Sequence, residues 1–93
     1  MPRLIWSQEA HRDIAAINDY LEQFDGDLAA ATLAAIAKAA DILTSFPAIG
    51  PTHSSETRSL RAGRTHYVIV YAIRSGAIVI LHIYHDRQDW RAE

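Results

Sequence analysis

The feature that most constrains the fold of this chain is a pair of apolar runs separated by Ser75-Gly76. Residues 67–74 and 77–85 are rich in Val, Ile, Tyr and Leu, which are the residue types that favour strands. A two-residue connection containing glycine, which adopts positive φ without strain, is typical of a β-hairpin. The stretch therefore predicts a hairpin in which Arg74 lies opposite Ala77 and Tyr67 lies opposite Tyr84.

The period of two along a strand sorts the side chains of this hairpin into two faces. One face is purely aliphatic and consists of Val68, Val70, Ala72, Val79, Leu81 and Ile83. Burial of each large aliphatic side chain contributes roughly 1.5–3 kcal/mol before chain entropy is subtracted. We therefore expect the aliphatic face to pack against the core.

The opposite face mixes apolar side chains with aromatic and polar tips. It consists of Tyr67, Ile69, Tyr71, Ile73, Ile78, Ile80, His82 and Tyr84. Such a face is too apolar for water, and a single helical hairpin covers only one side of a sheet. The sequence favours a partner protein as its cover, and a second layer of the same chain is the alternative.

The remaining segments predict one more strand on each side of a helical hairpin. A strand is expected at residues 3–6, followed by a helix that starts at Gln8 with Ser7 as its cap. This helix is expected to end at Asp25-Gly26-Asp27, where Asp27 caps a second helix over residues 28–46. Pro47 and Pro51 end that helix, and residues 58–62 alternate like a short strand. The predicted fold class is α+β with the order β-α-α-β-β-β, the helical hairpin lying on one face of a mainly antiparallel sheet.

Length and composition limit the classes of function. The 93 residues predict a single domain spanning 1–93, and the absence of cysteine removes disulfides and thiolate metal sites. No run reaches the roughly 18 apolar residues that span a bilayer, so a soluble, cytoplasmic protein without membrane contact is expected. The net charge of −2 disfavours direct binding of nucleic acid as the primary activity.

The charge is unevenly distributed along the chain. Residues 1–46 hold three basic and seven acidic side chains, whereas residues 47–93 hold six basic side chains, all Arg, and four acidic ones. Arginine favours planar recognition of carboxylate, phosphate or aromatic groups. We therefore expect a local cationic rim built from Arg58, Arg61 and Arg64 beside the aromatic face.

Four short motifs appear in a consistent order along nearly the whole chain. They are Leu4-x-Trp6-Ser7-x-Glu9-Ala10, Phe46-Pro47-x-x-Gly50, Gly63-Arg64-Thr65-x-Tyr67-Val68-Ile69-Val70-Tyr71 and Ile80-Leu81-x-Ile83-x-His85-x-Arg87-x-Asp89-Trp90. Together they resemble the ParE branch of the ParE/RelE superfamily of toxins. The resemblance implies the toxin of a type II toxin–antitoxin system that inhibits DNA gyrase, needs no cofactor, and is neutralised by a ParD-like antitoxin in a hetero-oligomeric complex.

The resemblance and the face assignment together give two sets of candidate site residues. The expected toxicity or target-binding residues are Arg61, Arg64, His85, Arg87 and Trp90. The expected antitoxin-binding residues are Tyr67, Ile69, Tyr71, Ile80 and Tyr84. An ordinary structural role for His85, as a hydrogen-bonded group at the end of the last strand, stays open beside the functional one.

Two other functions remain open at this stage. In a RelE-like ribosome-dependent mRNA endonuclease, Arg64 would bind phosphate and His85 would act as the general acid. Against an enzyme, Lys38 is the only lysine, and we expect this chain to lack the C-terminal extension that brings a tyrosine to the site in the nucleases it resembles. The third reading is a non-toxic binding module that keeps only the antitoxin surface.

No metal site is expected from the histidines. His82 and His85 are three positions apart on a strand and so point to opposite faces, and His66 joins them only by proximity.

Overall fold

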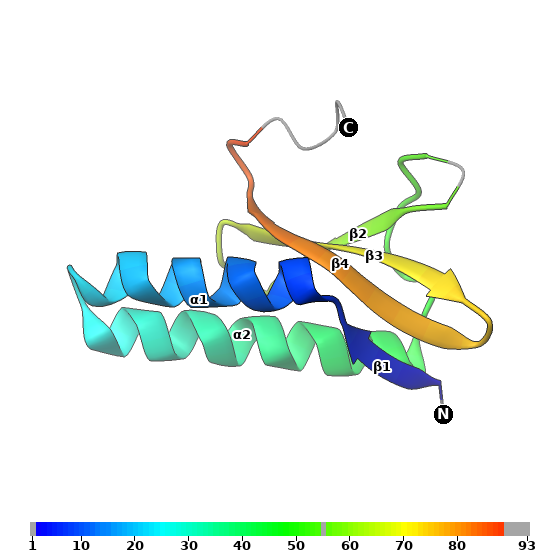
Figure 1. The fold of residues 1–93 in the computed structure, drawn as a ribbon, viewed down its shortest axis with the longest axis horizontal. Coiled ribbons are helices and arrows are strands. Elements are labelled where there is room, and N and C mark those ends of the chain that lie inside the picture. Colours follow the sequence, from blue (N-terminus) through cyan, green and yellow to red (C-terminus); the bar gives the residue numbers. More distant parts are fainter. Residues whose placement is uncertain (1, 55, 89–93) are drawn as a thin grey trace.

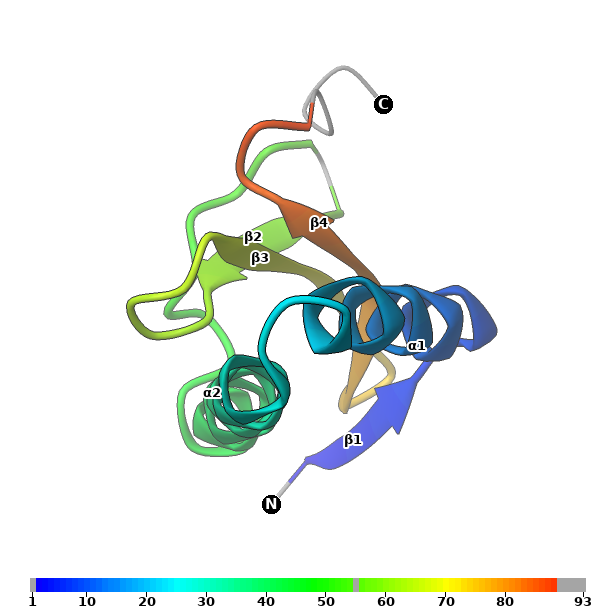
Figure 2. The ribbon, with the colours of Figure 1, turned by 90° about the vertical axis from the view of Figure 1, so that its left-hand side faces the viewer.

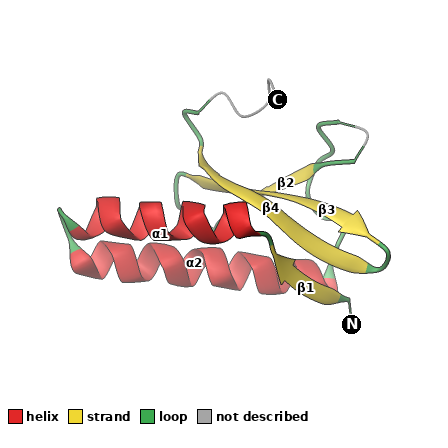
Figure 3. Ribbon diagram, in the orientation of Figure 1, coloured by secondary structure: helices red, strands yellow, loops and turns green. Residues whose placement is uncertain are grey.

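The computed structural model describes residues 2–54 and 56–88, which form two helices and one four-stranded sheet (Figures 1 and 3). The elements in chain order are β1 (Arg3–Trp6), α1 (Gln8–Glu22), α2 (Gly26–Ser45), β2 (Arg58–Arg61), β3 (Tyr67–Arg74) and β4 (Ala77–His85). The strand order is β1-β4-β3-β2, with β1 parallel to β4 and the other pairs antiparallel. The predicted α+β class and the order β-α-α-β-β-β are confirmed.

The two helices form an antiparallel hairpin that packs on one face of the sheet (Figures 1 and 2). Ser7 caps α1 as expected, because its Oγ accepts the Ala10 N–H at 3.0 Å. The cap of α2 is Asp25 rather than the predicted Asp27, since the Asp25 carboxylate accepts the N–H groups of Asp27 and Leu28. This earlier cap lets Gly26 enter the helix, and α2 starts two residues before the predicted position.

The hairpin strands have the predicted bounds, and their turn has positive φ at both Ser75 (51°) and Gly76 (76°), as in a type I′ turn. The register also follows the prediction from the Arg74–Ala77 pair to the Tyr71–Ile80 pair. Beyond that point it shifts by one residue, and Tyr67 lies opposite His85 instead of Tyr84. The cause is a β-bulge at Leu81, which alternation alone does not signal.

The bulge lies where β4 loses its neighbour β1. Past this point α1 covers the open edge of β4. The Ser7 Oγ donates to the Leu81 carbonyl at 2.8 Å, and the Asp13 carboxylate accepts the Ile83 N–H at 2.9 Å. Side chains of α1 thus replace a missing strand and fix the helix against the edge.

The assignment of the two hairpin faces was wrong, because the helices pack on the mixed aromatic face. Ile69, Tyr71, Ile78 and Ile80 are each 0% exposed and form the core with side chains of both helices. The bulge then turns Ile83 to the same side, where it is 3% exposed.

Tyr71 explains how an aromatic face with polar tips is buried. Its hydroxyl donates to the Pro47 carbonyl at 2.8 Å and accepts the Gly50 N–H at 3.1 Å, so the polar tip is satisfied within the core. Gly50 fits there because it has no side chain; a Cβ at this position would overlap the carbonyl group of Ser59. The segment after α2 therefore supplies hydrogen-bond partners for the buried Tyr71 hydroxyl, which the alternation of residues along the strand does not predict.

The predicted core face forms a smaller cluster on the other side of the sheet. Val68 and Val70 are buried there, and the half-buried Leu81 and Tyr84 pack against them. This second cluster is separate from the core between sheet and helices.

Among the described residues, one helix is long and apolar enough to span a membrane by length and composition, namely α2, with 20 residues and a mean hydropathy of 1.4. Ile36, Ala40 and Leu43 of this helix are buried in the core against the sheet. A core helix passes the same test, so this helix is only weak support for a membrane span.

Candidate functional site

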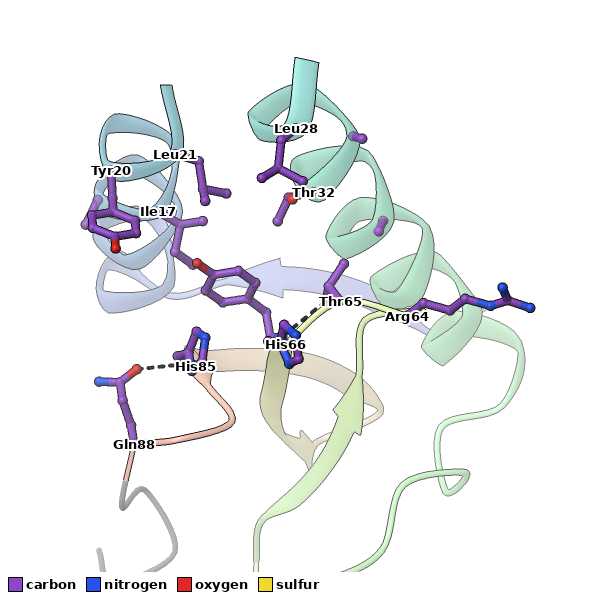
Figure 4. A pocket seen from close by; sticks show the side chains of 14 residues that line it. Ile17, Tyr20, Leu21, Leu28, Thr32, Arg64, Thr65, His66, His85 and Gln88 are labelled. Atoms are coloured by element: carbon purple, nitrogen blue, oxygen red, sulfur yellow. Dashed lines mark hydrogen bonds between the residues drawn. The ribbon is translucent and has the colours of Figure 1, made fainter. Parts of the chain in front are cut away.

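An open cleft of about 750 Å³ lies between the two helices, the loop after β2 and the end of β4 (Figure 4). α1 contributes Ala16, Ile17, Tyr20 and Leu21, and α2 contributes Leu28, Ala31, Thr32 and Ala35. The rim on the sheet side consists of Arg64, Thr65, His66, Tyr67, His85 and Gln88. Most of the lining is apolar, and exposed Phe24 and Leu28 extend this character to the hairpin turn between the helices.

The polar groups of the cleft are neutral or cationic. In the described part of the chain its charged or chargeable rim groups are Arg64, His66 and His85, and no carboxylate lines it. Burial raises the pKa of Tyr67, and the nearby Tyr20 raises it further, so the Tyr67 hydroxyl stays protonated at the cleft wall. The cleft therefore suits an apolar group that carries a negative charge or a hydrogen-bond acceptor.

Asp86 contacts both histidines of the rim and Arg61 of β2. Its Oδ2 accepts from Arg61 at 2.9 Å and from His66 Nδ1 at 3.0 Å, and its Oδ1 is 3.3 Å from His85 Nδ1. The Asp86 N–H also donates to the His66 carbonyl at 2.7 Å. The hydrogen bonds from Arg61 and His66 lower the pKa of Asp86 to about 2, so the carboxylate is ionised at neutral pH.

A closed turn follows β4. The His85 N–H donates to Gln88 Oε1 at 2.7 Å, and the Gln88 N–H donates back to the His85 carbonyl at 2.9 Å. The Arg87 N–H donates to His85 Nδ1 at 3.1 Å, which leaves the proton of the neutral imidazole on Nε2. The strand end and the first residues after it are thus fixed by three hydrogen bonds.

The structure separates the predicted target-binding residues. Arg64 points away from His85, which lies across the cleft from it (Figure 4). Arg61 is paired with Asp86, and Arg58 donates to the carbonyls of Ala48 and Gly50, so the three arginines do not form the predicted rim. Trp90 lies outside the described residues.

The predicted antitoxin-binding set does not form one surface. Ile69, Tyr71 and Ile80 are fully buried under the helices, so their side chains are unable to contact a partner in this fold. Tyr67 lines the cleft, whereas Tyr84 packs with Val68 and Val70 on the opposite side of the sheet. The error follows from the exchanged faces.

Several residues of the site were missed. The sequence suggests His66 only as a metal ligand and Asp86 only as a hydrogen-bond partner of His85, and it assigns no role to Gln88, although all three shape the rim. The Asp86-x-Gln88 polar pair directly after the last strand is a weak signal of a side-chain-closed turn. Within residues 2–54 and 56–88, no three metal-ligating side chains gather at one place.

This chain is a small α+β protein of the ParE/RelE class. Its helical hairpin packs on a four-stranded mixed sheet, and its apolar cleft lies between the helices and the end of β4. The family model described as "ParE toxin of type II toxin-antitoxin system, parDE" matches residues 4–90. The chain belongs to this family of toxins.

Individual relatives agree with this membership. The chain is 37% identical over 89 residues to the Sinorhizobium fredii protein described as "Putative toxin Y4kP", covering 95% of this chain and 92% of the relative. It is 36% identical over 86 residues to "Toxin RelE2" of Caulobacter vibrioides, covering 91% and 96%. The fold matches a chain of the chromosomal ParDE system from P. aeruginosa with a TM-score of 0.80 at 24% identity, over 91% of this chain and 96% of that one.

Proposed function

We propose that this toxin inhibits DNA gyrase and is neutralised by a ParD-like antitoxin. Membership in the ParE family supports the proposal, and one structural observation carries it. Arg64 and His85, the two residues that a RelE-like nuclease site would need together, diverge across the cleft (Figure 4).

The surroundings of His85 point in the same direction. Cleavage of RNA through its 2′-hydroxyl needs a base, an acid and a positive charge on one phosphate. His85 keeps a proton on Nε2, but Arg61 is paired with Asp86 and Arg64 points away from His85 (Figure 4), so neither arginine is placed to bind the same phosphate as His85. A binding function needs no such convergence, and toxicity then depends on the surface around His85 and the tail from Arg87 onward.

The cleft between the helices replaces the predicted sheet face as the proposed antitoxin surface. Tyr20, Phe24 and Leu28 are 59%, 68% and 49% exposed at its helical rim, which is unusual for side chains of this size in a lone soluble domain. A partner segment that covers them gains free energy from apolar burial, and the resulting complex is hetero-oligomeric. The proposed location of toxin, antitoxin and gyrase is the cytoplasm.

The test is supercoiling by purified gyrase beside mRNA cleavage on translating ribosomes, each with and without the toxin. We expect loss of supercoiling and intact transcripts, and restored supercoiling when the antitoxin encoded beside the toxin gene is added. Cleaved transcripts with unaffected gyrase would replace the proposal with RNA cleavage. No effect in either assay would favour a non-toxic binding module.

RNA cleavage is the second candidate, because one relative is named RelE2. The substitution His85→Gln separates the two, since glutamine keeps hydrogen bonding but does not titrate. In a nuclease it should lower the cleavage rate by roughly 10²- to 10⁴-fold. In a gyrase inhibitor we expect growth inhibition to survive His85→Gln better than Trp90→Ala or deletion from Arg87 onward, with circular dichroism confirming that each variant folds.

A further inference from the structure

Two imidazole rings lie stacked at the rim of the cleft. The ring centroids of His66 and His85 are 5.7 Å apart, and the ring planes differ by 21°. Both side chains line the cleft, one from the loop after β2 and one from the end of β4 (Figure 4). The pair thus joins two segments that are distant in the sequence.

The same carboxylate lies behind both rings. The Nδ1 atoms of His66 and His85 are 3.0 and 3.3 Å from the oxygens of Asp86. Within an imidazole ring the Nδ1 and Nε2 bonds to partners point in nearly opposite directions, so each Nε2 points away from Asp86. Because the rings line the cleft and Asp86 does not, both Nε2 atoms are presented on the cleft side.

Protonation decides what this pair offers to a ligand. Neutral His85 carries its proton on Nε2, because its Nδ1 accepts the Arg87 N–H. His66 donates from Nδ1 to Asp86, so its Nε2 is an acceptor when the ring is neutral and a donor when the ring is charged. When both rings carry a proton on each nitrogen, both Nε2 atoms are donors.

We propose that His66 and His85 together bind a carboxylate of the antitoxin segment that fills the cleft, which rests on the proposed function. The charge of the site selects this occupant. The described lining combines apolar side chains with Arg64 and two imidazoles and holds no acidic group, so an apolar anchor next to Asp or Glu is favoured and one next to Lys or Arg is repelled.

Other charged and titratable groups around the pair come from several elements. They are Tyr20 from α1, Arg61 from β2, Arg64 from the loop after β2, Tyr67 from β3, and Asp86 and Arg87 after β4. α2 contributes only uncharged side chains to the cleft. Asp86 is ionised and accepts from Arg61 and His66, so its charge is already paired.

The test uses 4-phenylbutanoate, an apolar group that ends in a carboxylate, and its neutral amide as the matched probe. Chemical shifts of the isotope-labelled full chain are followed by nuclear magnetic resonance. We expect the carboxylate to shift signals of both imidazoles and of the cleft, and to bind about threefold more tightly than the amide, the size typical of an exposed ion pair.

Substitutions assign the effect to the pair. The double substitution His66→Gln with His85→Gln should abolish the preference for the carboxylate over the amide, whereas His11→Gln, the same change on an exposed residue of α1, should retain it. An unchanged preference in the double variant, equal binding of the amide, or histidine-dependent binding of a short single-stranded RNA in place of the carboxylate would each overturn the proposal. Because this binding is measured without gyrase, a toxin that leaves gyrase active but shows the expected preference still supports the carboxylate site.

Discussion

The substitution Tyr71→Phe tests the central feature of this core. Tyr71 is fully buried, and its hydroxyl is the partner of two backbone groups that the segment after α2 turns inward. The bond with the Gly50 N–H is buried, so its loss leaves an unsatisfied donor and costs about 1–3 kcal/mol. The bond with the Pro47 carbonyl is partly buried, and its loss costs about 0.5–1.5 kcal/mol.

The expected total is therefore about 2–4 kcal/mol, a large share of the roughly 5–14 kcal/mol available to a domain of this length. At about 4–8 °C per kcal/mol, the melting temperature should fall by roughly 8–32 °C. The assay is urea unfolding followed by circular dichroism, with Tyr20→Phe at an exposed tyrosine as the control. A free energy of unfolding within about 0.5 kcal/mol of wild type would refute the argument that the hydroxyl permits burial of this face.

Three further outcomes are expected from stability measurements. Ile69→Asp should abolish cooperative unfolding because it places a charge in the core. Ile73 is 44% exposed at the strand end, so Ile73→Asp should lower the free energy of unfolding by less than about 1 kcal/mol. A larger loss of stability for Ile73→Asp than for Ile69→Asp would mean that the buried face of the hairpin is misassigned. Gly50→Ala should lower the free energy of unfolding by about 3 kcal/mol or more, because its Cβ overlaps the backbone of β2. A Cβ at Gly26 meets no atom within 4 Å, so Gly26→Ala should have a free energy of unfolding near that of wild type in the same unfolding experiments. Asp86 has a folded-state pKa of about 2 against 3.8 in the unfolded chain, so its contribution is present above pH 3.8 and is lost as the pH falls toward 2. Acid titration should show this loss in wild type and not in Asp86→Asn; identical curves would contradict it.

The sequence by itself determined the order of elements and most of their bounds. Ser7 followed by an amphipathic stretch, the break near Asp25 and the Ser75-Gly76 turn are local signals, and the structure follows them except that Asp25 replaces Asp27 as the cap of α2. They are local because capping and turn geometry depend on neighbouring residues. The four motifs also identified the family. These features need no knowledge of distant contacts.

Only the tertiary structure decided which face of the hairpin is buried. Alternation defines two faces but does not rank them when both are apolar, and the ranking here depends on Pro47 and Gly50 reaching Tyr71 from more than twenty residues away. The bulge at Leu81 likewise depends on α1 taking over the edge of β4 through Asp13. Both are contacts between segments far apart in the chain.

The rim of the cleft has the same origin. Arg61, His66 and Asp86 belong to three separate segments, and no spacing in the sequence links them. The antiparallel pairing of β3 with β4 brings the loop after β2 beside the end of β4, and one carboxylate then accepts hydrogen bonds from an imidazole and a guanidinium. Local chemistry fixed the elements of this toxin, and long-range pairing fixed its cleft, because hydrogen bonds between distant segments form only once the chain has folded.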